Sequence, residues 1–188
     1  MSASLHFAPL TVDTAPEGAR PLLAASARQF GFLPSPVATA AHSPALLKHL
    51  LAGFGAFDRT ALTPLEREIV AMTVGFAHGC HYCMAMHSAL QAGAPDVQPI
   101  VQALRDGAPL PDARLEALRR FALAVLHGRG RVAPEVAAAF LAAGYDAARA
   151  LDVVLGVGVY ALSTFANILT EAPLDPPFAA FAWQPPAA

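Results

Sequence analysis

The residues best suited to chemistry are Cys80 and Cys83, the only two cysteines in the chain, together with His87. A helix that begins at Cys80 would place the three side chains within an arc of about 60°, because successive helical residues are about 100° apart. Residues three apart on a helix lie roughly 5–6 Å from each other, which is within disulfide range. The spacing therefore predicts a reversible thiol pair beside an imidazole.

Two arguments disagree about which sulfur is the more acidic. Unsatisfied N–H groups and the positive dipole end of a helix N-terminus favour the thiolate, which points to Cys80. His87 follows Cys83 by one turn and could exchange a proton with it, which points to Cys83. Glu68, on the preceding predicted helix, could join a proton relay if the two helices pack antiparallel through a turn at Gly79.

Plainer interpretations of these residues are open at this point. Free cysteines bury well and could simply fill the core. The two thiols could instead bind zinc with His87 and either His78 or His81, although structural zinc usually needs four converging ligands. Glu68 could be a surface residue paired with Arg67 or Arg59.

The composition limits the kinds of partner to expect. The chain has 188 residues, of which 55% are apolar and 14% charged, whereas a typical domain has about 25% charged residues. We expect either a large core or a surface covered by other copies, and therefore a homo-oligomer. The net charge of −2 gives no reason to expect nucleic acid or a membrane. The length predicts a single domain over residues 1–188.

A cytoplasmic location is expected. The first basic residue is Arg20 and Pro9 interrupts the early apolar stretch, so no secretory signal is recognised. The uncharged run at residues 153–170 has the minimum length for a membrane span, but its polar side chains favour a buried helix. Asn167 in this run is expected to satisfy a buried backbone group.

Capping residues, prolines at first helical positions and glycine stops predict an all-α bundle of about eight helices, with no period-2 strand pattern. Capping boxes are expected at Thr14–Glu17 and Thr63–Glu66, and glycine stops at Gly31, Gly93, Gly107, Gly128 and Gly144. Proline clusters predict connections, and residues 172–188 a tail that packs on the surface. The expected helices are 16–29, 44–57, 64–78, 80–92, 95–105, 113–127, 134–143 and 147–170.

The arrangement of Glu68, Cys80-x-x-Cys83 and His87 resembles the alkylhydroperoxidase D-like group of the carboxymuconolactone decarboxylase superfamily. The matching core covers about residues 50–95, and a looser segment at residues 145–176 is similar to the peroxidase-related members. The resemblance implies a compact, all-helical, oligomeric fold and thiol-dependent reduction of hydroperoxides. No metal or other cofactor is expected.

Roles for four residues follow from this resemblance. Cys83 would attack the hydroperoxide, and Cys80 would resolve the resulting sulfenic acid as a disulfide. His87 and Glu68 would relay protons. An external dithiol, such as a lipoyl or thioredoxin-like protein, would return the pair to its reduced state, and the activity would be that of an antioxidant peroxidase or a disulfide oxidoreductase.

One departure from the family pattern concerns the residue before the second cysteine. The best-known peroxidase subgroup has a histidine there, where this chain has Tyr82, and His81 is displaced by one residue. Both are candidate pocket residues. Two other functions are open: a helical oligomer that senses oxidants or binds a partner without turnover, and a lactone decarboxylase like the superfamily's namesake, a subgroup that works without paired cysteines.

Overall fold

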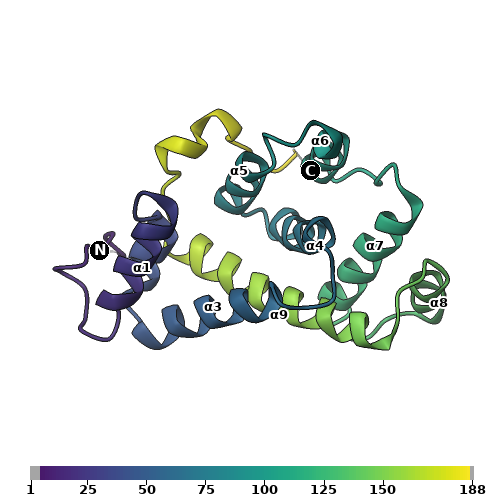
Figure 1. Ribbon diagram of the computed structural model, residues 1–188, viewed down its shortest axis with the longest axis horizontal. Coiled ribbons are helices and arrows are strands. Elements are labelled where there is room, and N and C mark those ends of the chain that lie inside the picture. The colour runs from purple at the N-terminus through teal and green to yellow at the C-terminus, as the bar shows by residue number, and fades with distance from the viewer. Residues whose placement is uncertain (1–4, 187–188) are drawn as a thin grey trace.

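The fold consists of helices joined by short connections (Figure 1). The computed structural model describes residues 5–186, and within that range no strand occurs, so the all-α prediction is confirmed. Two of the helices, η1 and η2, are 3₁₀-helices. The elements are α1 (Arg20–Phe30), α2 (Ser35–Ala40), α3 (Pro44–Phe57), α4 (Pro64–Ala77), α5 (His81–Leu90), η1 (Pro95–Val97), α6 (Gln98–Asp106), α7 (Ala113–His127), α8 (Pro134–Ala142), α9 (Ala147–Leu169) and η2 (Pro176–Phe181).

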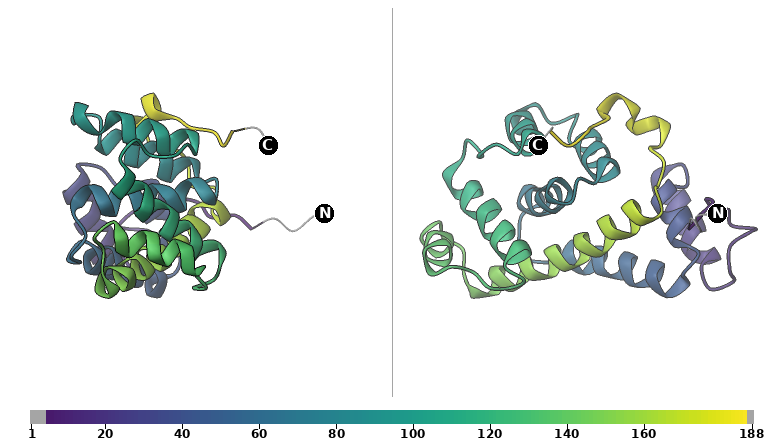
Figure 2. Two further views of the ribbon diagram at one scale, coloured as in Figure 1. Left: turned by 90° about the vertical axis from the view of Figure 1, so that its right-hand side faces the viewer. Right: turned by 180° about the vertical axis from the view of Figure 1, so that it is seen from behind.

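Helix α4 lies in the middle of the molecule and contacts α5, α6, α7 and α9 (Figures 1 and 2). Its residues Ile69 and Val70 are fully buried in the main apolar core. Phe57 of α3, Leu118 of α7 and Val153 of α9 belong to the same core. Because α4 is enclosed in this way, both ends of the helix have fixed positions, and the cysteine-bearing α5 begins directly after it.

The helix boundaries agree closely with the sequence, apart from one capping box. Thr63 and Glu66 form the expected capping box of α4, with their reciprocal hydrogen bonds at 3.3 and 2.8 Å. The box predicted at Thr14 and Glu17 is wrong, because α1 begins only at Arg20. The Thr14 hydroxyl is hydrogen-bonded to Thr11 instead, so it is not available to cap a helix.

The expected glycine stops are only partly correct. Gly31, Gly107 and Gly144 take the left-handed conformation that ends a helix, with φ of 77°, 66° and 87°. Gly128 does not, since its φ is −78°. Gly93 is also outside that region, and α5 already ends at Leu90.

Two short elements, α2 and η2, occur where proline clusters predicted only connections. In each case proline occupies the first turn, where its missing N–H leaves no helical hydrogen bond unmade. The C-terminal segment that contains η2 crosses α5 and α6. There the Trp183 indole N–H donates to the Arg105 carbonyl at 2.9 Å, and Phe178 is buried. Residues 187–188 of the predicted tail are outside the described range, and the single-domain organisation stays a prediction.

Helix α9 has two different faces. One packs on α3, α4 and α7, and the other exposes apolar side chains such as Leu151, Val154 and Phe165. In the described part of the chain, α9 is the helix that is long and apolar enough to cross a membrane, by length and composition alone, and 33% of its apolar stretch is buried. The predicted buried helix at residues 153–170 is therefore buried along one face only.

Candidate active site

The cysteine pair lies where α4 turns into α5. Gly79 takes a left-handed φ of 67°, and the Cys80 N–H donates to the Gly75 carbonyl at 2.9 Å, which closes the turn. The sequence predicted a helix that begins at Cys80, but Cys80 is the N-cap of α5 and His81 is its first residue. Its sulfur therefore accepts the Cys83 backbone N–H at 3.3 Å, in the way that a capping side chain does.

Cys80 and Cys83 are joined by a disulfide, with their Cα atoms 5.4 Å apart. Their side chains are almost completely enclosed, with exposed fractions of 1% and 3%. The surroundings are largely apolar and include Ala85 and Phe178, with Phe32 packed beside them. Such surroundings disfavour a thiolate, so any polar group that reaches the sulfurs will strongly affect their chemistry.

Glu68 and His87 meet as the antiparallel arrangement of α4 and α5 suggested. The Glu68 carboxylate lies 2.8 Å from Nδ1 of His87, and both side chains are largely buried. Burial by itself would lower the pKa of His87, but the charge and the hydrogen bond of Glu68 raise it above its ordinary value. The pair is thus a buried imidazole whose proton affinity is set by a carboxylate.

The four predicted residues form two separate pairs, the Cys80–Cys83 disulfide and the hydrogen-bonded Glu68 and His87, rather than one continuous proton relay. Within residues 5–186, no hydrogen bond joins His87 to either sulfur, although His87 follows Cys83 by one helical turn. The His87 ring instead packs edge-on against Tyr160, with centroids 5.5 Å apart. Tyr160 also has a raised pKa, chiefly because it is buried and also because Glu68 is near.

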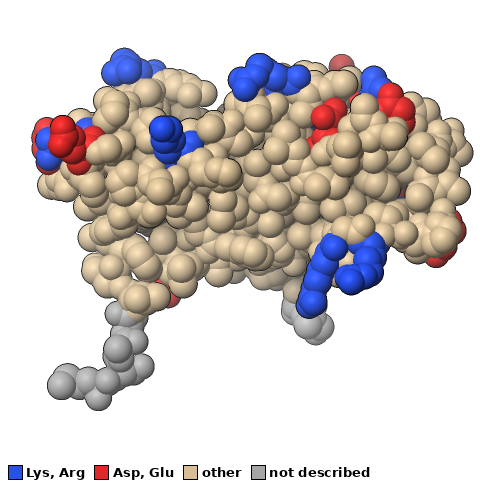
Figure 3. Space-filling view, turned by 90° about the horizontal axis from the view of Figure 1, so that it is seen from below, with Lys and Arg blue, Asp and Glu red and all other residues tan. Residues whose placement is uncertain are grey.

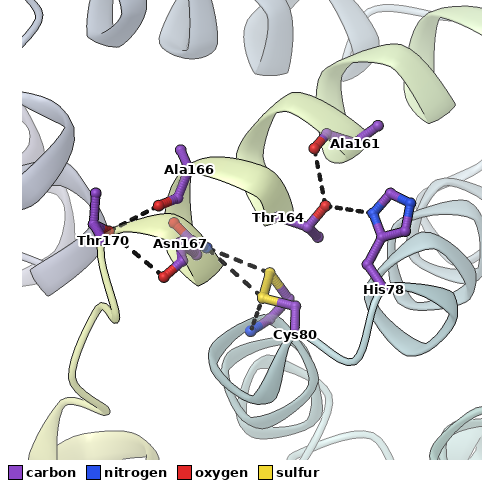
Figure 4. Close-up of a disulfide and its surroundings, with 8 residues drawn as sticks. His78, Cys80, Ala161, Thr164, Ala166, Asn167 and Thr170 are labelled. Atoms are coloured by element: carbon purple, nitrogen blue, oxygen red, sulfur yellow. Dashed lines mark hydrogen bonds between the residues drawn. A yellow bond between two sulfur atoms is a disulfide. The ribbon is translucent and has the colours of Figure 1, made fainter. Parts of the chain in front are cut away.

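The side chain that does contact the sulfurs is Asn167 of α9 (Figure 4). Its amide nitrogen is 3.4 Å from the Cys83 sulfur and 3.9 Å from the Cys80 sulfur. The expectation that this side chain satisfies a backbone group is wrong, because the end of α9 crosses directly over the disulfide. Thr164, Asn167 and Thr170 recur every three residues in an apolar helix, and this polar stripe was the signal that could have identified it.

Thr164 also connects α9 to the end of α4. Its hydroxyl is 2.7 Å from Nδ1 of His78, the C-cap residue of α4 (Figure 4). The His78 ring stacks on Phe165 at 4.7 Å. Burial, with a smaller contribution from His127, lowers the pKa of His78 and favours its neutral form. His78 is therefore a helix-end residue.

Tyr82 and His81 differ in position. The buried Tyr82 hydroxyl donates to Asp175 at 2.6 Å, and the other oxygen of that carboxylate is 2.5 Å from the Ser35 hydroxyl. Burial, and then Asp175, raise the pKa of Tyr82, so the phenol keeps its proton. This side chain joins α5 to the C-terminal segment and to α2. His81 is the first residue of α5 and is partly buried.

The zinc interpretation finds no support in the side chains. In the part of the chain that the structure describes, no group of three His, Cys, Asp or Glu side chains could hold a metal ion. The two sulfurs are bonded to each other. His78, proposed as a further ligand, uses Nδ1 for Thr164.

Comparison with known proteins identifies a family in the central part of the chain. Residues 44–124 match the carboxymuconolactone decarboxylase family. This range runs from the first residue of α3 into α7 and contains Glu68, Cys80, Cys83 and His87. No curated protein matches the sequence.

Solved structures extend the similarity to nearly the whole chain. A peroxidase-related protein from Ralstonia eutropha JMP134, described as an alkylhydroperoxidase AhpD core, has a TM-score of 0.78 at 22% identity and covers 94% of this chain and 96% of its own. A peroxidase-related protein from Silicibacter sp. TM1040 has a TM-score of 0.74 at 19% identity, with coverages of 95% and 97%. An alanine variant of the debrominase Bmp8, in complex with 2,3,4-tribromopyrrole, has a TM-score of 0.73 at 17% identity, with coverages of 96% and 97%.

These similarities confirm the resemblance that the motif suggested. At such low identity the solved structures establish the fold alone, and the family model matches the segment that carries the site. Residues 44–124 match the carboxymuconolactone decarboxylase family model, and the chain has the fold of the alkylhydroperoxidase AhpD core.

Proposed function

We propose that this protein is a thiol-dependent oxidoreductase that reduces hydroperoxides. The observation that carries the proposal is the disulfide between Cys80 and Cys83, on the same short helix as His87 in its buried pair with Glu68. The two thiols supply two electrons when they close to the disulfide, and an imidazole with a carboxylate partner can accept and return protons. The family match and the peroxidase-related neighbours support this class of activity.

The reaction begins with the reduced pair. His87 takes the proton from Cys83, whose thiolate attacks the terminal oxygen of the hydroperoxide. A sulfur–oxygen bond forms, the oxygen–oxygen bond breaks, and the departing alkoxide receives a proton from His87 to give an alcohol. Cys80 then loses its proton and attacks the sulfenic sulfur of Cys83, and hydroxide leaves and is protonated to water. One hydroperoxide and two thiols thus yield an alcohol, water and the disulfide.

An external dithiol completes the cycle. Its thiolate attacks one sulfur of the Cys80–Cys83 disulfide to form a mixed disulfide. Its second thiol then attacks that mixed disulfide, which closes the donor's own disulfide and leaves both cysteines as thiols. A lipoyl or thioredoxin-like protein fits this role, by the family resemblance. A cytoplasmic location belongs to the same proposal, because thiol pools there supply electrons.

The test combines stopped-flow kinetics with thiol counting. The reduced protein is mixed with one equivalent of cumene hydroperoxide, and the expected result is the loss of two thiols per chain with one alcohol formed. Cys83→Ser should abolish the reaction, whereas Cys80→Ser should stop at a sulfenic acid that dimedone traps. A reduced protein that keeps both thiols while the peroxide persists would overturn the proposal.

The same preparation discriminates the alternative functions. The debrominase among the structural neighbours makes an organohalide a second candidate electrophile, so 2,3,4-tribromopyrrole is tested in parallel with bromide release as the readout. Lactone decarboxylation that survives in a Cys80→Ser, Cys83→Ser double variant would favour the lyase. A change of oligomeric state on oxidation without turnover would favour a sensor.

We further propose that copies of this chain associate through the outward face of α9. Exposed or half-exposed apolar residues recur along it at alternating spacings of four and three, the pattern of a coiled-coil seam. On the side of the molecule where α3 and α9 lie, Figure 3 shows a broad area without charged side chains. The seam consists of Ala147, Leu151, Val154, Gly158, Ala161, Phe165 and Ile168.

The position of Gly158 favours a second copy as the occupant of this seam. Gly158 lies at the middle of the seam, and apart from the adjoining backbone of α9 no described atom lies within 4 Å of the place where its Cβ would be. Two copies of α9 that cross there about a two-fold axis would therefore cover each other's seams from end to end. Light scattering should give an oligomer for the wild type and a monomer for Leu151→Lys, with the exposed Ala179→Lys as control. A monomeric wild type would refute the proposal.

A further inference from the structure

We infer that the side-chain amide of Asn167 is a catalytic group that stabilises the thiolate of Cys83 by hydrogen bonding. The inference deepens the proposed function and rests on it for the reaction that the thiolate performs. It assigns the helix α9, which contributes none of the four motif residues, a direct part in the chemistry of the sulfurs.

The need for such a group follows from the surroundings of the disulfide. Both sulfurs are buried among apolar side chains, and removal from water favours the neutral thiol over the thiolate. A thiolate formed there must be compensated by hydrogen bonds or by nearby positive charge. The strength of a hydrogen bond roughly doubles when the acceptor carries a charge. An amide donor therefore stabilises the thiolate more than the thiol.

The two sulfurs receive different donors. Cys80 accepts the backbone N–H of Cys83 at 3.3 Å, a consequence of its N-cap position. The amide nitrogen of Asn167 is closer to Cys83, at 3.4 Å, than to Cys80, at 3.9 Å. Asn167 thus supplies Cys83 with the donor that the helix start supplies to Cys80. The helix N-terminus alone would favour the thiolate of Cys80 over that of Cys83, and the hydrogen bond from Asn167 to Cys83 offsets this preference.

Other polar side chains near the sulfurs already have partners. His78 uses Nδ1 for the Thr164 hydroxyl, and the Tyr82 hydroxyl donates to Asp175. Tyr82 stands where the best-known peroxidase subgroup has a histidine, and its hydroxyl is directed to the C-terminal segment instead. Within residues 5–186, Asn167 is the side chain whose N–H groups are hydrogen-bonded to the sulfurs. Its amide orientation is fixed in the reduced state, because a thiolate accepts only from the nitrogen.

The same contact affects the reduction of the disulfide. When an external thiolate attacks Cys80, the sulfur of Cys83 leaves as a thiolate, and the Asn167 amide is already in place to stabilise it. A leaving thiol of lower pKa departs faster. Asn167 should therefore make the disulfide easier to reduce as well as making Cys83 the more reactive thiol.

The test measures each sulfur separately. In a Cys80→Ser background, the pH dependence of iodoacetamide alkylation gives the pKa of Cys83, with and without Asn167→Leu. Loss of one hydrogen bond to a charged group should raise this pKa by about one unit and slow alkylation about tenfold below it. In a Cys83→Ser background the same substitution should shift the pKa of Cys80 much less. Ser163→Ala, on the same helix, is the matched control.

A second variant and a second measurement cover the case that Asn167→Leu folds poorly. In the chain with both cysteines, Asn167→Ala should lower the disulfide midpoint potential by about 30 mV for a tenfold change in equilibrium, with circular dichroism as the check of fold. An unchanged pKa of Cys83 and an unchanged potential in folded variants would overturn the inference. A wild-type protein that fails to reduce hydroperoxides would refute the proposed function, yet the pKa shift would still be measurable.

Discussion

The α4–α5 hairpin and the C-terminal half of α9 build the site in different ways. The hairpin provides Glu68, Cys80, Cys83 and His87, whose relative positions follow from helical spacing and one glycine turn. Helix α9 provides Asn167, which reaches the sulfurs from far along the chain. The motif is therefore local in sequence, whereas the group that contacts both sulfurs depends on how one helix crosses another.

The positions of these site residues are therefore fixed in two different ways. Within the hairpin, the register of the helix keeps the thiols and the imidazole together even when the rest of the fold changes. Asn167 holds its place only if α9 packs correctly on α4, which in turn requires the close contact at Gly156. Substitutions in the hairpin should mainly change the chemistry, and substitutions along α9 should change stability, the pKa of the thiols and self-association.

The largest effect is expected from Glu68→Gln in the hairpin. His87 loses the carboxylate that orients its ring, and proton transfer by a positioned side chain contributes about 10²–10⁴-fold to rate. We expect the hydroperoxide reaction to slow at least about 100-fold. Glu66→Gln is the matched control, because Glu66 binds Tyr145 and Arg114 instead and should affect stability. Equal rates for Glu68→Gln and wild type would remove the relay from the mechanism.

The raised pKa of His87 also predicts how the reaction rate depends on pH. His87 must be neutral to accept a proton, so the rate should rise as pH passes its raised pKa. In Glu68→Gln the negative charge that raises this pKa is lost, and the rise should move to lower pH. A raised folded-state pKa also means that the pair stabilises the fold fully below the ordinary value of about 6.5, and that this contribution is lost as pH rises through the folded value. Urea unfolding of both proteins across pH measures that difference.

The sequence predicted most of the fold because its helix boundaries are marked locally. The ends of α3 and α7 agree with the expected residues 44–57 and 113–127. The short α2 and η2 were missed because a proline in a first turn resembles a proline in a connection. The closeness of Cys80 and Cys83 was predicted from spacing, whereas the meeting of Glu68 and His87 was expected only if α4 and α5 pack antiparallel. Asn167 was not predicted, since spacing along one helix does not reveal the crossing of another.

The next largest effect is expected from Gly156→Ala on the inward face of α9. A Cβ there would lie 2.5 Å from the Phe57 ring and 2.9 Å from Val70, both in the main core. Overpacking of this kind costs about 1–3 kcal/mol and here should exceed the gain in helix propensity, for a net loss of about 2 kcal/mol. Urea unfolding measures the loss. Unchanged stability would mean that α9 can shift, and then the position of Asn167 would not be fixed.

Tyr82→Phe should have a smaller effect, limited to stability. The variant loses the hydroxyl that donates to Asp175 and leaves that carboxylate with Ser35 alone. A hydrogen bond to a charged group contributes about 1.5 kcal/mol at the lower end of its range, so thermal unfolding should occur at a lower temperature. The pKa of Cys83 should stay unchanged. A shift in that pKa would instead place Tyr82 in the relay.

The smallest effect, and the one of opposite sign, is expected from Gly158→Ala on the outward face of α9. Apart from the adjoining backbone of α9, no described atom lies within 4 Å of the added methyl group, so the exposed helix should gain about 0.8–1.0 kcal/mol from the better propensity of alanine. Unfolding at low protein concentration measures this gain. If copies cross at Gly158, the same methyl group keeps them apart, and sedimentation should show weaker self-association. A gain in stability with unchanged association would confirm that Gly158 is on the exposed face of α9 but would show that copies do not meet at Gly158.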